Sequence, residues 1–283
     1  MEDTTRRLEE KRRSYALSVT GHIGIDREST IGRAIMEAFE LIPRENFVGA
    51  PPWRIVAPEG HQQSVASNVE DLYQDVLVSL DLKRGLNNGQ PSLHAYCLNA
   101  LAPRNGEKAV HVGTGTGYYT AILAKLVGEV GRVDGYEIEP DLADQAAANL
   151  STFSQVETHS RSGAEAPLPE CDVLYVSAAC AEPLGVWLDA LRYGGRLLFP
   201  LAPGGEAGQM LLVTRNANDC YAAQFLGAVQ FVACIGAQDD NTAQRLEVAY
   251  RGGNWKAVKS LKRNNEPDES CWFAGRGWWL STH

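Results

Sequence analysis

The segment HVGTGTGYYTAILAKL, residues 111–126, joins a short apolar strand to a helix through glycines at alternate positions, Gly113, Gly115 and Gly117. Because glycine has no Cβ, the backbone can turn tightly after the strand and approach a ligand closely, and the following helix begins nearby with free N–H groups. The pattern predicts a strand over 108–112 and a helix over 119–126. It indicates a nucleotide-cofactor loop in an α/β fold.

An acidic residue follows this loop at the spacing typical of such sites. A second apolar run, residues 132–136, ends in Glu137, about twenty residues beyond the loop, where a carboxylate can take both ribose hydroxyls of a nucleoside. A dinucleotide dehydrogenase would normally read G-x-G-x-x-G/A, whereas this loop reads G-T-G-T-G-Y and ends at Tyr118. The pattern therefore favours S-adenosylmethionine over NAD. A purely structural glycine turn is the third interpretation.

The rest of the chain predicts a doubly wound, mainly parallel sheet with helices on both faces and ligand sites at the carboxyl ends of the strands. A helix is expected over 31–41, ended by Pro43, and the charged residues 1–15 also look helical. Residues 51–68 predict an irregular crossing segment. We expect an N-terminal helical and crossing segment, a cofactor-binding domain and a C-terminal extension, over residues 1–86, 87–237 and 238–283. After Glu137 we expect helices over 141–150 and 183–191 and strands over 156–159, 172–177, 196–200, 209–214 and 222–231, the last entered through a turn at 216–219.

Composition agrees with a globular enzyme. The chain has 283 residues, 44% of them hydrophobic, which is enough to bury a substantial core. Its net charge of -9 disfavours a broad nucleic-acid surface, and the short basic stretches at 6–13 and 256–263 are better explained as solvated helix faces. We expect no nucleic-acid partner, and either a monomer or a homodimer.

Six cysteines occur without a C-x-x-C pair or a His/Cys cluster, so neither zinc nor a disulfide framework is predicted. Several lie in apolar runs, which suits a reducing cytoplasm. The first fifteen residues lack the apolar core of a signal peptide, and no apolar run approaches the roughly 20 residues that span a bilayer. We therefore expect a soluble, cytoplasmic protein without a membrane or metal partner.

Several ordered segments resemble the protein-L-isoaspartate O-methyltransferase family. IPRENFV (residues 42–48) is similar to the family's V-P-R-x-x-F-V, NNGQPSLHA (87–95) to its T-I-S-Q-P segment, and the glycine loop to its cofactor loop. DVLYVSAACAEP (172–183) and LRYGGRLLFPL (191–201) are similar to its D-x-I-x-V-T-A-A-x-x-x-x-P and L-K-x-G-G-R-L-V-x-P. The resemblance implies a Rossmann-like class I methyltransferase that uses S-adenosylmethionine.

The resemblance also implies the chemistry and the residues that carry it. The family methylates a carboxylate of a damaged aspartyl residue; since a carboxylate is already ionised near neutral pH, the enzyme mainly aligns it and excludes water. The loop expected at the acceptor consists of Gly89, Gln90, Pro91 and Ser92. The residues expected at the cofactor are His111, Gly113, Thr114, Gly115, Gly117, Tyr118, Glu137, Ile138, Ser162, Gly163, Ala178 and Ala179.

Two positions depart from the family pattern. Gly89 stands where the family serine places a hydroxyl beside the acceptor carboxylate, and Ser162-Gly163 stands where the family commonly has G-D-G near the adenine. Losing one hydrogen bond to a charged group costs about 1.5–3 kcal/mol, roughly tenfold to over a hundredfold in rate. Asn87, Asn88 or Ser92 could supply a substitute donor, or could simply be polar loop residues.

The C-terminal part contains further features that the family pattern does not cover. We expect a helix over 242–249, a basic helix over 255–262 and a tryptophan-rich end in which Trp272, Trp278 and Trp279 form either a substrate lid or a packed extension. His94 could face the acceptor or be a core histidine, and His111 is expected mainly to pack.

Carboxyl O-methylation of a protein or peptide is thus the leading hypothesis. A dedicated peptide, such as a ribosomally made precursor, or a small-molecule acceptor is the first alternative, and a non-catalytic S-adenosylmethionine-binding protein is the second.

Overall fold

The computed structural model describes residues 2–56, 63–203, 207–217, 220–264 and 266–283. The chain divides into two compact units. Unit 1 consists of Met1–Gly106, Thr114–Gly135 and Glu139–Ser160, and unit 2 of Glu107–Gly113, Tyr136–Ile138 and Arg161–His283. Both the glycine loop and the strand that ends at Glu137 therefore run from one unit into the other.

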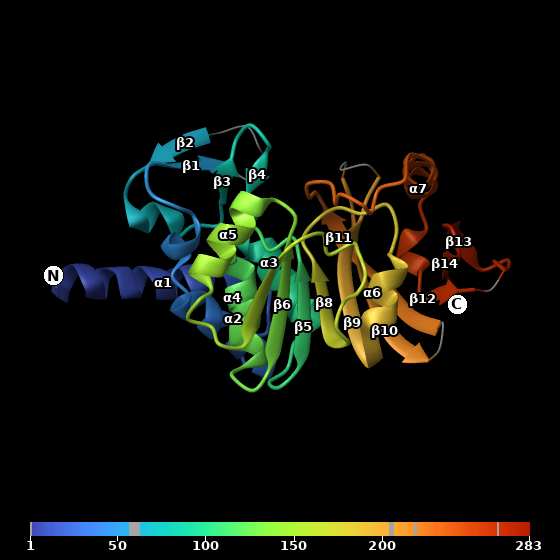
Figure 1. Cartoon of the computed structure of the whole chain (residues 1–283), viewed down its shortest axis with the longest axis horizontal. Coiled ribbons are helices and arrows are strands. Elements are labelled where there is room, and N and C mark those ends of the chain that lie inside the picture. The colour runs from blue at the N-terminus through green and yellow to red at the C-terminus, as the bar shows by residue number, and fades with distance from the viewer. Residues whose placement is uncertain (1, 57–62, 204–206, 218–219, 265) are drawn as a thin grey trace. The chain divides into compact units, whose positions relative to one another are not determined.

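Unit 1 contains the N-terminal helices and two short 3₁₀ turns (Figure 1). The helix predicted over 31–41 is confirmed as α2, which begins after Ser29, whose side chain accepts a hydrogen bond from the Gly32 N–H. Phe39 on α2 packs edge-on against Tyr15 and Tyr118, so aromatic rings form much of the local core. The helical elements of the unit are α1 (Glu2–His22), α2 (Thr30–Leu41), η1 (Arg44–Phe47), η2 (Val69–Leu72), α3 (Pro91–Leu101), α4 (Tyr118–Val127) and α5 (Pro140–Asn149).

The irregular crossing segment expected over 51–68 is wrong in part, because two strands of a small antiparallel sheet in unit 1 lie there. Its strands are β1 (Trp53–Val56), β2 (Gln63–Ala66), β3 (Leu77–Asp81) and β4 (Leu86–Asn87), in the order β2-β1-β3-β4. The register pairs Trp53 with Ala66 and Ile55 with Val78. Residues 57–62 of the expected segment lie outside the described residues. The strands are too short to show a clear alternation in the sequence, and only their pairing reveals them.

A larger, ten-stranded sheet begins in unit 1 with β6 (Arg132–Glu137) and its neighbour β7 (Val156–Ser160). Its part in unit 2 runs in the order β13-β14-β12-β11-β10-β9-β8-β5. The pairs β5–β8 and β8–β9 are parallel, which confirms the predicted α/β class, and the pairs from β9 outward to β13 are antiparallel. The strands are β5 (Lys108–Val112), β8 (Cys171–Val176), β9 (Leu191–Leu201), β10 (Gly208–Ala217), β11 (Cys220–Val229), β12 (Ser260–Arg263), β13 (Cys271–Ala274) and β14 (Trp278–Ser281).

The core of unit 2 lies along these strands. The buried side chains of Leu174, Leu197 and Phe199 form its centre, and α6 (Gly185–Ala190) adds Trp187, which is fully buried. Figure 1 shows α6 beside β9, on which it packs. Of the turn expected over 216–219, residues 216–217 instead end strand β10, and residues 218–219 lie outside the described residues.

The C-terminal extension confirms one expectation, corrects another and decides between the two interpretations of Trp278 and Trp279. The helix predicted over 242–249 is confirmed as α7 (Asp240–Gly252), but the basic helix expected over 255–262 is wrong. A short 3₁₀ turn, η3 (Trp255–Ala257), is followed there by strand β12, because residues 260–262 pair with β11 and this tertiary pairing overrides local helix propensity. Trp278 and Trp279 are 4% and 2% exposed, so they pack the extension and are not available as a lid. Among the described residues, no helix combines the length and apolar character needed to cross a membrane.

Candidate functional site

The glycine loop leaves β5 at the position the sequence predicts. The Gly113 N–H donates to the Tyr136 carbonyl oxygen at 2.9 Å, which joins the ends of β5 and β6 within unit 2. Gly113, Gly115 and Gly117 have φ values of +80°, +57° and +101°, a left-handed region that side chains disfavour. Gly117 caps α4, so the free N–H groups of that helix begin directly after the loop.

Thr114 lies inside this loop with an unused polar atom. Its Oγ1 is buried and has no hydrogen-bond partner among the described residues. Gly135 of β6 lies beside it, since a Cβ built on Gly135 would be 2.9 Å from that Oγ1. A buried hydroxyl without a partner is costly unless a ligand supplies one, so this atom fits a polar group of a bound nucleoside cofactor.

Glu137 ends β6 and is buried, with 8% of the residue exposed. The following residue, Ile138, is 38% exposed. Carboxylates are seldom this buried unless hydrogen-bond donors surround them. A ribose has two hydroxyl donors that a carboxylate at this strand end can accept, so the residue type fits the cofactor that the sequence predicts.

Ser162 and Gly163 follow β7 and are both buried. A Cβ on Gly163 would lie 2.7 Å from a methyl group of Val112, so only glycine lets the chain pack against the end of β5. The Gly163 carbonyl accepts a hydrogen bond from the Trp187 indole at 2.8 Å, and Ser162 Oγ accepts one from the Ala164 N–H at 3.1 Å. The Ser162 hydroxyl can still donate its own proton.

Ala178 and Ala179 form the turn after β8, and their backbone is fixed from the segment that follows β11. The Ala179 N–H donates to Val232 O, and its carbonyl accepts from the Cys234 N–H, both at 2.7 Å. The Gln238 side-chain amide also donates to the Ala179 oxygen at 2.5 Å.

His111 and Tyr118 are both enclosed by protein. The His111 ring stacks on Tyr175, and its Nε2 lies 2.9 Å from Ser177 Oγ. Burial lowers the pKa of His111 to about 3, so the imidazole is neutral at physiological pH. The Tyr118 ring packs against Phe39 in unit 1. Both side chains support the loop from its two ends.

The loop expected at the acceptor lies in unit 1, before α3. Gly89 has a φ of +69°, and a Cβ built on it would lie 2.9 Å from His94 Cδ2 and closer still to Nε2. The His94 ring stacks on Tyr119 with centroids 3.5 Å apart, and the Tyr119 hydroxyl donates to the Gly89 carbonyl at 3.2 Å. The imidazole of His94 thus occupies the volume of any side chain at position 89.

Asp75 holds the next residues of this loop. Its carboxylate accepts hydrogen bonds from the Ser92 N–H, the Ser92 hydroxyl and the Gln90 amide at 2.8, 2.6 and 2.9 Å. Pro91 begins α3. Since the Ser92 proton is directed at Asp75, Ser92 is not the substitute donor that the sequence suggested.

The two asparagines of the loop also have structural partners. Asn87 Oδ1 accepts from the Gly89 N–H at 2.8 Å, and Asn88 Oδ1 accepts from Arg44 Nε at 3.2 Å. The fully buried Arg44 guanidinium also donates to the carbonyls of Leu72, Gln74 and Val76 at 2.8, 3.2 and 2.7 Å, and so fixes the segment that carries Asp75.

Sequence reasoning missed Arg44 and Asp75 as residues that organise this loop. Arg44 could have been identified from the sequence, because it lies in the IPRENFV segment that carries the resemblance. Asp75 stands alone in the sequence, with no motif around it, and only the fold brings it to Ser92. His94 is a candidate in the sequence, but its contact with Gly89 arises only in the fold.

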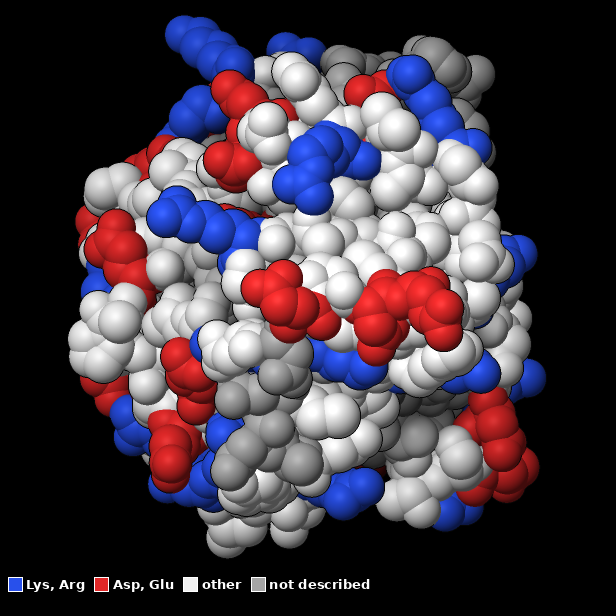
Figure 2. All heavy atoms as spheres, turned by 90° about the vertical axis from the view of Figure 1, so that its right-hand side faces the viewer, with Lys and Arg blue, Asp and Glu red and all other residues white. Residues whose placement is uncertain are grey.

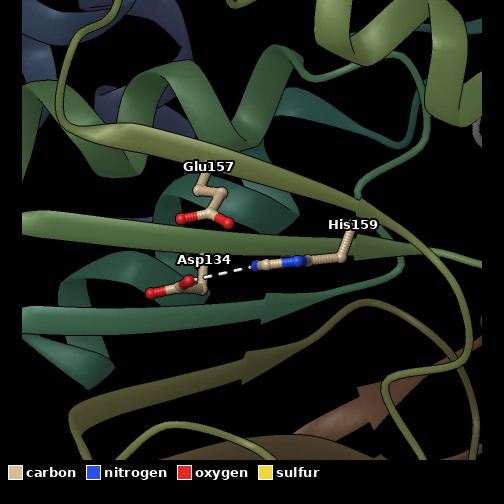
Figure 3. Close-up of side chains that lie close together, drawn as sticks. All are labelled: Asp134, Glu157 and His159. Atoms are coloured by element: carbon tan, nitrogen blue, oxygen red, sulfur yellow. Dashed lines mark hydrogen bonds and ion pairs between the residues drawn. The ribbon is translucent and has the colours of Figure 1, made fainter.

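A cluster away from these loops brings together Asp134, Glu157 and His159 on β6 and β7 (Figure 3). One ligand atom from each lies within 4.8 Å of the others, a set that could hold a metal ion. However, Arg132 pairs with Asp134 at 2.9 Å and also with Glu157, and His159 Nε2 lies 3.1 Å from Asp134 Oδ1. The Arg132 guanidinium already pairs with both carboxylates, so we assign the cluster to holding the two strands together.

The surface of the C-terminal side carries charges of both signs. Figure 2 shows lysine and arginine interspersed with aspartate and glutamate over this face, and its described residues form no extended basic area. This mixture lacks the single-sign footprint expected of a nucleic-acid groove on this face.

Comparison with known proteins agrees with the motifs. Residues 25–239 match the family model described as Protein-L-isoaspartate(D-aspartate) O-methyltransferase (PCMT). A protein-L-isoaspartate O-methyltransferase 2 from Anaeromyxobacter is 33% identical over 208 residues, which cover 71% of this chain and 75% of that protein. One from Methanocella arvoryzae is 34% identical over 174 residues, or 59% of this chain and 90% of that protein.

Solved structures show the same fold. A protein-L-isoaspartate O-methyltransferase aligns with a TM-score of 0.67 at 20% identity, covering 84% of this chain and 69% of that one. A Plasmodium falciparum structure described as such a methyltransferase, in complex with S-adenosyl-L-homocysteine, aligns with a TM-score of 0.62 at 18% identity, covering 80% and 98%. The family match over most of its length and the relative at 33% identity show that the chain belongs to the protein-L-isoaspartate(D-aspartate) O-methyltransferase family.

Proposed function

We propose that this methyltransferase uses S-adenosylmethionine to methylate a carboxylate of isoaspartyl residues in proteins or peptides. The observation that carries the proposal is a glycine loop followed by the buried carboxylate of Glu137, in a chain of this family. The unpartnered Thr114 hydroxyl in the loop supports it. From the sequence, we further propose that the protein is cytoplasmic and that its oligomeric state is a monomer or a homodimer.

The proposed roles follow the sequence predictions. Gly113, Thr114, Gly115 and Gly117 would line the methionine and ribose side of the cofactor, and Glu137 would accept the ribose hydroxyls. Ser162 and Gly163 would lie at the adenine, Ile138 beside it, and Ala178 and Ala179 near the reacting methyl. His111 and Tyr118 would act by supporting the loop. The domain division 1–86, 87–237 and 238–283 stays a prediction.

The reaction requires little proton transfer by the protein. S-adenosylmethionine supplies an electrophilic methyl group, and the acceptor carboxylate is ionised near pH 7. The task left to the chain is to hold the acceptor in line and to exclude water. Asp75 and Arg44 would serve this task by making the Gly89–Ser92 loop rigid, since their hydrogen bonds fix its side chains and the segment behind it.

Methyl transfer to a matched peptide pair tests the proposal. Labelled S-adenosylmethionine is supplied with an isoaspartyl peptide and its normal aspartyl counterpart, and methanol release is measured. We expect label only on the isoaspartyl peptide. Labelling of neither peptide by protein that binds the cofactor would refute the repair activity. The Glu137→Gln variant, compared with Glu165→Gln at an exposed carboxylate, reports whether the signal depends on the cofactor site.

One observation favours a second candidate, a dedicated peptide or small-molecule acceptor. His94 fills the volume beside Gly89 that a family serine would use, so the surroundings of the acceptor differ from the family pattern. Turnover confined to one peptide or metabolite would identify this case. Cofactor binding without turnover on any carboxylate would instead indicate a non-catalytic binding protein.

A further inference from the structure

Two cysteines of unit 2 lie on neighbouring segments beside the turn after β8. Cys180 belongs to that turn and Cys234 to the segment after β11; they are 0% and 6% exposed. Ala179 and Ala233 form a parallel β-bridge, and both backbone bonds of Ala179 go to the residues on either side of Ala233. The two cysteines are the next residues along each segment.

This bridge sets the geometry of the pair. In a parallel pairing, residues one step beyond a bridged pair oppose each other and point to the same face, and neighbouring segments lie about 4.8 Å apart. That spacing falls inside the Cα separation of roughly 4.4–6.8 Å at which disulfides form. The side chains of Cys180 and Cys234 interact with each other, as expected for neighbours on one face.

The two thiols differ in acidity. Burial raises the pKa of Cys180, which therefore keeps its proton, whereas the hydrogen bond from Cys180 lowers the pKa of Cys234. The Cys180 sulfur also lies 3.1 Å from the Ala178 carbonyl oxygen, a second acceptor for the same proton. Cys234 is therefore the more readily ionised thiol of the pair, and a disulfide forms by attack of a thiolate.

We propose that Cys180 and Cys234 are a redox-modification site that a peroxide converts to a disulfide. Cys234 sulfur attacks one peroxide oxygen, the O–O bond breaks, and a sulfenic acid forms with release of hydroxide, which takes up a proton to become water. Cys180 sulfur then attacks the sulfenic sulfur, its proton leaves with the departing hydroxyl as a second water, and the S–S bond forms. Overall, one hydrogen peroxide and two thiols give one disulfide and two waters.

The modification would act on the proposed cofactor site, and this part rests on the proposed function. Disulfide sulfurs are about 2.05 Å apart, much closer than two hydrogen-bonded thiols, so closure draws the turn at Ala178–Ala179 toward the segment around Cys234. Gln238, which donates to the Ala179 oxygen, lies on that same segment. Oxidation should therefore lower the affinity for the cofactor.

Peptide mapping of the full-length protein tests the modification without any assay of function. The protein is treated with hydrogen peroxide, alkylated under denaturing conditions and digested without reductant. We expect a crosslinked peptide pair containing Cys180 and Cys234, which dithiothreitol removes. The pair should be absent from Cys234→Ser and from Cys180→Ala, and present in Cys220→Ser, which changes an exposed thiol. Full alkylation of both cysteines in oxidised wild-type protein would overturn the proposal.

Calorimetry with S-adenosylhomocysteine tests the consequence. Reduced protein should bind it, and oxidised protein should bind at least tenfold more weakly, with recovery in dithiothreitol and no change in Cys234→Ser. Equal affinity before and after crosslinking would overturn the regulatory part. Failure of the reduced protein to bind would count against the proposed function instead, while the crosslink still decides the redox site.

Discussion

Replacing Gly89 with serine, the residue of the family pattern, should destabilise this protein and not improve it. A Cβ at this position would lie 2.9 Å from His94 Cδ2 and 3.2 Å from Tyr119 Cε2, on a backbone with a φ of +69°. The left-handed conformation costs a non-glycine residue about 1–2 kcal/mol, and overpacking against two stacked rings costs about 1–3 kcal/mol. We expect Gly89→Ser to lower the free energy of unfolding by about 2–5 kcal/mol.

Urea unfolding of full-length variants measures this, and Gly85 provides the matched control. Gly85 has the same φ of +69°, but nothing lies within 4 Å of a Cβ built there, so Gly85→Ser carries the strain without the clash. Adding His94→Ala should relieve the clash and make the Gly89→Ser/His94→Ala pair non-additive by about 1–3 kcal/mol. If Gly89→Ser is no more destabilising than Gly85→Ser, the reasoning about His94 is wrong.

Three further changes test the site. Glu137→Gln should weaken S-adenosylhomocysteine binding about 10- to 100-fold by calorimetry, because it removes charged hydrogen bonds, whereas Glu165→Gln should not; equal effects would contradict the ribose role. Asp75→Asn leaves the Ser92 N–H and hydroxyl with a weaker acceptor, so kcat/KM for the peptide should fall about tenfold with unchanged cofactor affinity. A purely structural role would instead lower the free energy of unfolding and leave kcat/KM unchanged. The pKa of His111 is about 3 in the folded chain and 6.5 in the unfolded chain, so between pH 6.5 and pH 3 only the unfolded chain gains this proton. The free energy of unfolding is therefore highest above pH 6.5 and falls by up to about 1.4 kcal/mol per pH unit between pH 6.5 and pH 3. In His111→Gln, the slope of the free energy of unfolding against pH, measured by urea unfolding, should fall by the contribution of one proton. An unchanged slope would contradict the assignment.

The sequence predicted the elements around the glycine loop well. The glycines at 113, 115 and 117, the strand before them, the helix after them and Glu137 all stand where their spacing placed them. The same holds for most of the alternating strands and helices, including β8, α5 and α7. These features are local: a strand, a turn without Cβ atoms and a helix are each encoded by a few adjacent residues.

Only the tertiary structure decided the rest, because each of these features depends on residues far apart in the chain. The small sheet β1–β4 and strand β12 exist through pairing with distant partners, which overrides weak or misleading local patterns. Asp75 accepts a hydrogen bond from Ser92 only because Arg44 fixes the segment that carries Asp75. The His94 ring occupies the volume that a side chain at Gly89 would need. The Cys180–Cys234 pair likewise arises from one bridge between segments more than fifty positions apart, a contact that no local sequence pattern encodes.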